Sequence, residues 1–306
     1  MKQKILLADP LLKKYLFLYQ KYFEVDTLWS KKKLNYNEYE GLVVSGLFKI
    51  PSNLYNKMSK LKIISLFSVG FDNVNLDICK KKNISVSNTP KVLTNDVADL
   101  ALTLLLSISR NIYNAHNYVL NNSWEKKGPM DLTDSVNKKK VGIVGLGQIG
   151  KKFAIKAKAL NMDISYFGPS KKNNNYKYFK NLKKMANYID YLVITCAGGK
   201  NTHNLINNEV LKCMKNTSYL INISRGTVID ENALIYHLNN KNIKGAALDV
   251  FKSEPKINYK LKKMNNVILY PHHASGTHET RREMAELSIK NLIQYFKRGK
   301  PLYKVL

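Results

Sequence analysis

The strand-like run Val141–Val144 leads directly into the motif Gly145-Leu-Gly147-Gln-Ile-Gly150, and an amphipathic helical segment follows. Few folds accommodate this order of strand, glycine-rich turn and helix. The first glycine makes the turn, the second lets the backbone approach a pyrophosphate, and the third lets the helix pack closely on the strand. The N-terminus of the helix then faces the phosphates. The motif therefore predicts a dinucleotide-binding unit rather than a tight strand–helix turn without a ligand.

Short apolar runs alternate with helical stretches on both sides of this motif, which is typical of an α/β fold with a mostly parallel sheet. At about 150 residues per domain, the 306 residues indicate two domains. We expect helices over Thr94–Asn111 and about 280–297, and a loop or extended arm over Asn121–Asn137. The expected strands are Ile5–Ala8, Leu42–Ser45, Ile63–Phe67, Ile84–Ser87, Asp163–Phe167, Tyr191–Thr195, Ser218–Ile223, Ala246–Asp249 and Val267–Tyr270.

The composition is strongly basic, with 50 Lys and Arg against 22 Asp and Glu and a formal net charge of +28. Such an excess is found in proteins that bind nucleic acid or anionic membranes. Here it consists mostly of lysines in short runs beside asparagines, such as Lys31–Lys33 and Lys80–Lys82. A bias towards Lys and Asn explains this spread at least as well, and neither a basic tail nor a DNA-reading motif is present. We therefore predict neither a nucleic-acid nor a membrane partner.

The cysteines Cys79, Cys196 and Cys213 are odd in number and form no Cys-x-x-Cys pair, which is typical of a reduced, cytoplasmic protein. The longest apolar stretch, Val97–Ser109, is too short to span a membrane and contains Asp99. The N-terminal run is also too short for a secretory signal. The histidines lack the spacing of metal ligands, so we expect no metal site.

The strand after the glycine-rich helix is followed by Gly168-Pro-Ser170-Lys171-Lys172, without an acidic residue. An NAD site normally has Asp or Glu here, which accepts hydrogen bonds from the ribose hydroxyls. A carboxylate would repel a 2′-phosphate, whereas Ser170 and the two lysines can bind one. We therefore expect NADPH as the preferred cofactor, with NADH also accepted. The alternative is that these lysines belong only to the general lysine excess.

Further motifs stand at wide separations along the chain. They are Ser68-Val-Gly-Phe-Asp72, Asn88-Thr-Pro, Thr94-Asn-Asp-Val-Ala98, Asn222-Ile-Ser-Arg225-Gly, Asp249-Val-Phe-Lys-Ser-Glu254-Pro and Pro271-His272-His-Ala-Ser-Gly-Thr277. Together with the glycine-rich motif they resemble the D-2-hydroxyacid dehydrogenases, in particular the glyoxylate/hydroxypyruvate reductase branch, in the order of that family. The resemblance covers about residues 61–298, and the first sixty residues match only in their α/β rhythm.

The resemblance implies two Rossmann-like domains with doubly wound parallel sheets and an active site in the interdomain cleft. Residues 1–96 and 276–306 would form a discontinuous substrate domain, and residues 97–275 the dinucleotide-binding domain. It also implies a homodimer formed through the Val97–Lys140 region, where Trp124 lies on the expected arm. An exposed tryptophan is costly in a monomer, although Trp124 packing on its own domain is the alternative.

The roles that the resemblance gives to Arg225, Glu254 and His272 agree with the chemistry of reducing a 2-oxo acid. Arg225 has a planar fork that can engage a carboxylate and the adjacent carbonyl oxygen. His272 can deliver a proton near neutral pH. Glu254 would orient the imidazole and favour its protonated form. All three follow predicted strands, at the sheet edge where open α/β sheets bind ligands.

The resemblance further assigns the substrate carboxylate to the backbone amides of Val69 and Gly70. The predicted substrate-binding residues are these two together with Arg225 and His272. The implied cofactor positions are Gly145, Gly147, Gln148, Ile149, Gly150, Gly168, Ser170, Lys171, Ala197, Ile223, Asp249 and Ala274. His273, beside the proposed proton donor, is expected only to line the site.

The sequence thus predicts an NADPH-dependent reductase that converts glyoxylate to glycolate and hydroxypyruvate to D-glycerate. One alternative keeps the chemistry and changes the substrate to a 2-keto sugar acid or a bulkier 2-oxo acid. A second alternative, from a different class, is a dinucleotide-sensing binding protein of the same fold.

Overall fold

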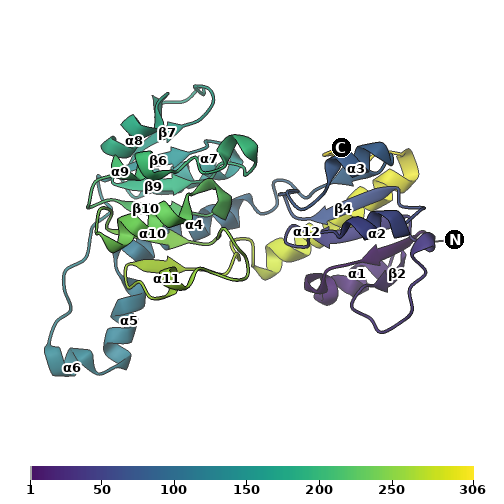
Figure 1. Ribbon diagram of the computed structural model, residues 1–306, viewed down its shortest axis with the longest axis horizontal. Helices are drawn as coiled ribbons and strands as arrows, with labels where there is room; N and C mark the ends of the chain where they lie inside the picture. The colour runs from purple at the N-terminus through teal and green to yellow at the C-terminus, as the bar shows by residue number, and fades with distance from the viewer. Residues whose placement is uncertain (1) are drawn as a thin grey trace. The chain divides into compact units, whose positions relative to one another are not determined.

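The computed structural model describes residues 2–306. The chain divides into two compact units. Figure 1 labels helices and strands of both units. Unit 1 comprises the chain up to Leu93 together with Gly276–Leu306, and unit 2 comprises Thr94–Ser275. Each unit contains one parallel sheet with interleaved helices, so the predicted α/β fold with two parallel sheets is confirmed.

Unit 1 has a five-stranded parallel sheet with the strand order β2-β1-β3-β4-β5. The strands are β1 Lys4–Leu7, β2 Glu24–Thr27, β3 Gly41–Ser45, β4 Ile63–Phe67 and β5 Ser85–Ser87. The helices are α1 Leu16–Gln20, α2 Ser52–Lys57, α3 Leu76–Lys81 and α12 His278–Arg298. Every residue of β3 and β4 is buried, which explains why these strands read as uninterrupted apolar runs.

The long helix α12 packs on β4 and carries the chain to its C-terminal segment. The hydroxyl of Thr277 caps the helix by accepting the Thr280 amide (3.2 Å), and Gly299 ends it in a left-handed conformation. The segment after the helix then runs antiparallel to β5: the Val305 amide donates to the Val86 carbonyl (2.7 Å). The last residues of the chain therefore cover the edge of this sheet.

Unit 2 has a seven-stranded parallel sheet with the order β12-β11-β10-β9-β6-β7-β8. The strands are β6 Lys140–Val144, β7 Asp163–Phe167, β8 Lys177–Phe179, β9 Tyr191–Ile194, β10 Tyr219–Asn222, β11 Gly245–Leu248 and β12 Val267–Leu269. The strand order reverses between β6 and β9. In an open parallel sheet, this switch point, at the carboxyl ends of the strands, is where ligands bind.

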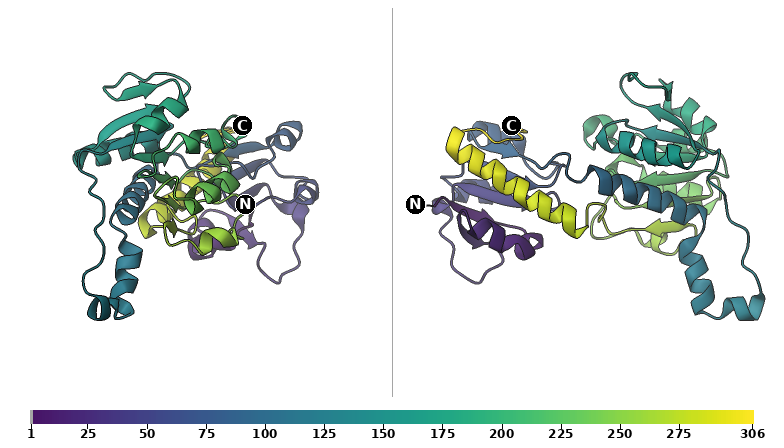
Figure 2. Two further views of the ribbon diagram at one scale, coloured as in Figure 1. Left: turned by 60° about the vertical axis from the view of Figure 1, so that its left-hand side comes forward. Right: turned by 180° about the vertical axis from the view of Figure 1, so that it is seen from behind.

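The helices of unit 2 are α4 Thr94–Ser109, α5 Ile112–Leu120, α6 Ser123–Lys127, α7 Gln148–Ala159, α8 Leu182–Tyr188, α9 Asn208–Lys212, α10 Glu231–Asn239 and α11 Tyr259–Lys262. All of them except α5 and α6 lie against the sheet (Figures 1 and 2). Helices α8, α9 and α10 share one buried apolar cluster with the central strands, while α4 packs against α7 and against β10 and β11.

Helices α5 and α6 extend away from the sheet of unit 2 (Figures 1 and 2). The expected loop over Asn121–Asn137 is therefore partly wrong, because Ser123–Lys127 forms a short helix within it. Several large apolar side chains of this arm are exposed, among them Tyr113, Leu120 and Trp124, which is 63% exposed. The arm thus presents apolar surface that unit 2 does not cover.

Two strands were not predicted, and both lie at the edge of a sheet. The sequence of β2, Glu-Val-Asp-Thr, has one large apolar residue, and its Asp26 carboxylate pairs with Lys4 and Lys32. The three residues of β8 follow a polar, asparagine-rich segment. Such edge strands lack the buried apolar run that identifies a central strand.

Asparagine occupies several left-handed turns of the backbone. Asn83, Asn111, Asn122, Asn161 and Asn204 all have φ between 48° and 59°. Asparagine tolerates this conformation better than other residues with a side chain. In the part of the chain that is described, no helix is long and apolar enough to cross a membrane.

Candidate active site

The glycine-rich turn joins β6 to α7, as the motif predicted. Gly145 has φ +95°, and a Cβ placed on it would lie 2.6 Å from the Cα of Cys196. A Cβ on Gly150 would lie 2.4 Å from the carbonyl oxygen of Gly145. Around the Cβ position of Gly147, by contrast, residues 2–306 place no heavy atom within 4 Å apart from the adjoining backbone. The first and third glycines therefore allow close packing, while the second leaves room at the start of α7 for a ligand.

The end of β7 carries the residues expected to distinguish NADPH from NADH. Ser170 and Lys171 are exposed, Gly168 is half-buried, and no carboxylate follows the strand. The backbone here is held by two tyrosines, since the Tyr178 hydroxyl donates to the Gly168 carbonyl (3.1 Å) and the Lys172 amide donates to the Tyr166 hydroxyl (2.6 Å). A polar, positively charged segment thus stands where an NAD site has an acid.

The remaining cofactor positions lie after the other strands of the same sheet or at the start of α7. Gln148 and Ile149 open α7, Ala197 follows β9, and the buried Ile223 follows β10. Burial raises the pKa of the neighbouring Cys196 thiol to about 11, so this cysteine stays protonated near neutral pH. Because parallel strands end at one edge, these positions share the carboxyl edge of the sheet.

Arg225 follows β10 in a turn that the side chain of Asn222 fixes. The Asn222 carboxamide is fully buried; it donates to the Arg225 carbonyl (3.0 Å) and accepts the Ser224 amide (3.0 Å). The guanidinium donates to the Ser224 carbonyl (2.7 Å). The next residue has to be glycine, because a Cβ on Gly226 would lie 1.9 Å from the carbonyl carbon of Phe251. This close approach brings the loop after β11 next to Arg225.

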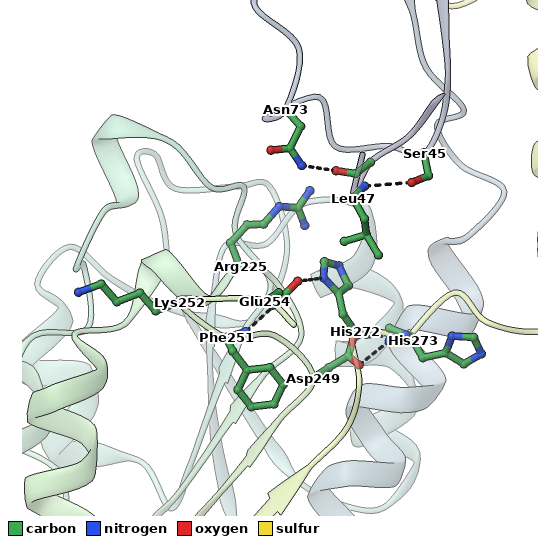
Figure 3. A network of polar contacts seen from close by, with 12 residues as sticks. Ser45, Leu47, Asn73, Arg225, Asp249, Phe251, Lys252, Glu254, His272 and His273 are labelled. Atoms are coloured by element: carbon green, nitrogen blue, oxygen red, sulfur yellow. Dashed lines mark hydrogen bonds and ion pairs between the residues drawn. The ribbon is translucent and has the colours of Figure 1, made fainter. Parts of the chain in front are cut away.

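That loop supplies Glu254, whose carboxylate is held at both oxygens. Oε1 accepts the Phe251 amide (2.8 Å), and Oε2 contacts Nδ1 of His272 (2.6 Å; Figure 3). An imidazole nitrogen that faces a carboxylate carries a proton, so Nδ1 is the donor. The other nitrogen of the ring, Nε2, is thereby left as the one that can exchange a proton with a ligand.

The backbone of His272 adopts a left-handed conformation, with φ 49°. Its amide donates to the carbonyls of Asp249 (2.8 Å) and Tyr270 (3.0 Å). The Asp249 carboxylate, which is almost fully buried, accepts the amides of His273 (2.7 Å) and Ala274 (3.2 Å). Asp249 thus holds the loop that carries His272, and Figure 3 shows the His273 ring pointing away from the Glu254–His272 pair.

The charges of the site oppose the effect of burial on its carboxylates. Burial alone would raise the pKa of Glu254, but the hydrogen bond and charge of His272, the Phe251 amide and the charge of Arg225 lower it below its ordinary value. Burial of Asp249 dominates and raises its pKa, despite the amides of His273 and Ala274 and the charge of His272. Glu254 is therefore ionised near neutral pH, and its carboxylate accepts a hydrogen bond from Nδ1 of His272.

In unit 1, the segment after β4 presents two backbone amides. The Ser68 carbonyl accepts the Thr89 amide (2.9 Å), and the Val69 carbonyl accepts the Asn88 carboxamide (2.9 Å). A trans peptide directs each C=O and the following N–H to opposite sides. The N–H groups of Val69 and Gly70 thus point away from Asn88 and Thr89, and within residues 2–306 neither has a hydrogen-bond partner.

Several residues that build these sites were not among the predicted positions. Asn222 and Gly226 belong to the motif that contains Arg225. Ser68 and Asn88 each begin a motif, but neither was assigned a role of its own. Only the buried asparagine at the end of a strand gives a sequence signal, because an amide there commonly fixes a turn. Residues 2–306 contain no cluster of three His, Cys, Asp or Glu side chains that could hold a metal ion.

Comparison with known proteins identifies the family. Residues 102–274 match the model of the "D-isomer specific 2-hydroxyacid dehydrogenase, NAD binding domain". The chain is 44% identical over 252 residues to hydroxyphenylpyruvate reductase of Plectranthus scutellarioides, covering 82% of this chain and 80% of the relative. It is 38% identical over 257 residues to 2-ketogluconate reductase of Gluconobacter oxydans, covering 84% and 83% of the two chains.

A solved structure is similar over the whole chain. It is the NADPH-dependent glyoxylate/hydroxypyruvate reductase of Sinorhizobium meliloti in complex with NADP and malonate. The TM-score is 0.92 and the identity 32%, with 100% of this chain and 97% of that chain covered. These matches confirm the resemblance that the sequence motifs indicated. The chain belongs to the D-2-hydroxyacid dehydrogenases, a family of oxidoreductases, and to their glyoxylate/hydroxypyruvate reductase branch.

Proposed function

We propose that the protein is an NADPH-dependent reductase of small 2-oxo acids, which converts glyoxylate to glycolate and hydroxypyruvate to D-glycerate. The observation that carries the proposal is the contact of Glu254 with Nδ1 of His272 (2.6 Å) beside the guanidinium of Arg225. A carboxylate-backed imidazole next to a fixed cation suits a substrate that has both a carbonyl oxygen to protonate and a carboxylate to bind.

The cofactor would bind at the glycine-rich turn and along the carboxyl edge of β6, β7, β9 and β10. The open space at Gly147 and the N-terminus of the twelve-residue helix α7 fit a pyrophosphate. The chemistry that a bound dinucleotide would supply is a hydride for C2 of the substrate. Ser170 and Lys171 fit a 2′-phosphate, and no carboxylate at the end of β7 opposes it.

The protein side chains supply the proton and hold the substrate. As C2 gains the hydride, the carbonyl oxygen takes a proton from Nε2 of His272, and the ring becomes neutral. Before the transfer, ionised Glu254 stabilises the imidazolium and keeps Nε2 directed at the substrate. Arg225 binds the carboxylate and polarises the carbonyl oxygen, and the amides of Val69 and Gly70 add neutral donors to the carboxylate.

The direct test is a panel of kcat/KM values for glyoxylate, hydroxypyruvate, pyruvate, hydroxyphenylpyruvate and 2-ketogluconate, each with NADPH and NADH. We expect glyoxylate, hydroxypyruvate and NADPH to give the highest values, and His272→Gln to lower kcat by about 10²- to 10⁴-fold. Equal values with NADH would contradict the role of Ser170 and Lys171. NADPH binding without turnover of any of the five acids would favour a dinucleotide sensor.

The relatives favour a second candidate substrate class. The most similar proteins named above are a hydroxyphenylpyruvate reductase and a 2-ketogluconate reductase, both of which act on acids bulkier than glyoxylate. The catalytic residues would be the same, because all of these substrates share the reacting 2-oxo acid group and differ only in the side chain attached to it. A kcat/KM that increases with the size of the substrate side chain in the same panel would establish this alternative.

We also propose that the protein is a cytoplasmic homodimer assembled through the arm formed by α5 and α6. The arm exposes Tyr113, Leu120 and Trp124, and burial of such side chains between subunits is favourable. All three cysteines are free, in agreement with a reducing compartment. Light scattering should give twice the chain mass, and Trp124→Glu should give the monomer; a monomeric wild type would contradict the assembly.

A further inference from the structure

Residues 68–71 of unit 1 form the loop to which the proposed function assigns the substrate carboxylate. Within residues 2–306, no hydrogen bond from a charged side chain holds this loop. Its shape depends on three carbonyls that accept hydrogen bonds from the Thr89 amide, the Asn88 carboxamide and the Ser68 hydroxyl. The last of these bonds joins Ser68 Oγ to the Gly70 carbonyl (2.6 Å). The direction of each following N–H is therefore set by the donors to these three carbonyls.

Asn88 is the only one of these donors that reaches the loop from another segment by its side chain. Its Nδ2 donates to the Val69 carbonyl (2.9 Å), which sets the direction of the Gly70 N–H. Its own main chain is held in turn: the Asn88 carbonyl accepts Nδ2 of Asn291 (2.9 Å), and the Asn88 amide donates to the Tyr303 carbonyl (3.3 Å). The position of Asn88 thus depends on α12 and on the segment that follows it.

Asn291 connects these two elements. It lies in the middle of α12 and is fully buried, where a polar side chain is retained only if its hydrogen bonds are made. Its Nδ2 donates to Asn88, and its Oδ1 accepts the Tyr303 amide (3.0 Å). One carboxamide therefore joins the helix, the C-terminal segment and the residue that holds the loop.

We propose that Asn88 and Asn291 are positioning residues for carboxylate binding: Asn291 fixes Asn88, and Asn88 orients the Val69–Gly70 amides towards the substrate. The inference rests on the proposed function, because it takes these amides as the donors to the substrate carboxylate. It assigns a role in substrate affinity to a residue of α12 that contacts neither substrate nor cofactor.

The test measures carboxylate binding separately from turnover. Oxalate has carboxylates but no aldehyde or ketone carbonyl that could accept a hydride. Its Kd is measured by titration into the protein saturated with NADPH. KM and kcat are measured separately with glyoxylate. We expect Asn88→Leu to raise the Kd of oxalate and the KM of glyoxylate about tenfold, since a lost neutral hydrogen bond and a released loop both weaken binding. The kcat and the Kd of NADPH should change less than about twofold.

A matched control separates positioning from general destabilisation. Asn75 caps α3 in the same unit by accepting the Ile78 amide (3.0 Å). In the described part of the chain, it makes no hydrogen bond to residues 68–71. Asn75→Ala should lower the Tm by removing the cap but leave the Kd of oxalate unchanged. If Asn88→Leu lowers the Tm in the same way and also leaves this Kd unchanged, the inference is wrong.

The order of the two residues is tested by a double-variant cycle. Because Asn291 acts through Asn88, the Asn88→Leu/Asn291→Leu protein should bind oxalate as Asn88→Leu does, and additive losses would contradict the order. If Asn291→Leu does not fold, Asn88→Ser, which retains a shorter donor, should give an intermediate Kd. A wild type that binds no oxalate overturns the inference. A wild type that binds oxalate but reduces no 2-oxo acid overturns the proposed function alone.

Discussion

The two units differ in the groups that the proposed function assigns to an anionic substrate. Unit 2 presents charged side chains, Arg225 and the Glu254–His272 pair, held by a buried asparagine and by a glycine that permits close backbone approach. Unit 1 presents neutral backbone amides, which are directed by carboxamide and hydroxyl groups behind them. Charges that also transfer a proton affect the rate of reaction, whereas neutral donors affect affinity. Variants of the two units should therefore change different kinetic constants.

The largest difference is expected for His272→Gln. The glutamine keeps a polar side chain of similar size but cannot donate a proton, and loss of a general acid commonly lowers the rate by about 10²- to 10⁴-fold. Steady-state kinetics with glyoxylate should show this loss in kcat, with little change in KM. A large increase in KM with normal kcat would show that unit 2 also acts mainly on affinity.

Arg225→Lys should have the next largest effect. Lysine keeps the charge but loses the planar fork that engages carboxylate and carbonyl oxygen together. Loss of one charge-assisted hydrogen bond of about 1.5–3 kcal/mol corresponds to about 10- to 100-fold in kcat/KM. Because the carbonyl contact strengthens in the transition state, kcat should fall along with affinity. Retention of full kcat in Arg225→Lys would restrict this arginine to substrate binding.

Ser68→Ala should have a smaller effect, confined to affinity. It removes the hydrogen bond from the Ser68 hydroxyl to the Gly70 carbonyl (2.6 Å). A neutral hydrogen bond contributes about 0.5–1.5 kcal/mol, so the KM for glyoxylate should increase about 2- to 10-fold. A decrease in kcat instead of an increase in KM would contradict the division of roles between the two units.

The smallest effect is a pH-dependent difference in stability at Glu254. Its pKa is lower in the folded protein than in the unfolded chain, so its contribution is fully present above the ordinary carboxyl pKa and is lost as the pH falls through the lowered value. The Tm of the wild type should exceed that of Glu254→Gln at pH 7, and the difference should narrow below about pH 4. A difference that widens in acid would reverse the assigned direction of the pKa shift.

The sequence predicted the parts of the molecule that depend on apolar patterning or on an uncommon residue. The central strands and the glycine-rich turn followed from buried runs and from Gly145, Gly147 and Gly150, since few arrangements satisfy both. Arg225, Glu254 and His272 were named from motifs that resemble the family and from charged groups that suit its chemistry. The structure brings Glu254 and His272 into contact, and the catalytic roles stay predictions.

Other features were not predictable because their cause lies in tertiary contacts. The edge strand β2 exists because β1 pairs with it, and its own sequence has little β-strand character. The role of Asn88 depends on a contact with Asn291, 203 residues away, and nothing in the local sequence indicates it. Every residue except proline has a backbone N–H, so the residue types do not show which amides bind a ligand. Val69 and Gly70 were therefore inferred only from a family resemblance.

The left-handed asparagines give the compositional bias a structural consequence. Glycine is the usual residue at such turns, yet this chain has only 15 glycines in 306 residues. An asparagine at the same place restricts the denatured chain more than glycine does and so lowers the entropy lost on folding. Asparagines can therefore accumulate at the left-handed turns of this protein without making these turns more flexible. A β-branched residue in place of Asn83 or Asn161 would instead strain the backbone.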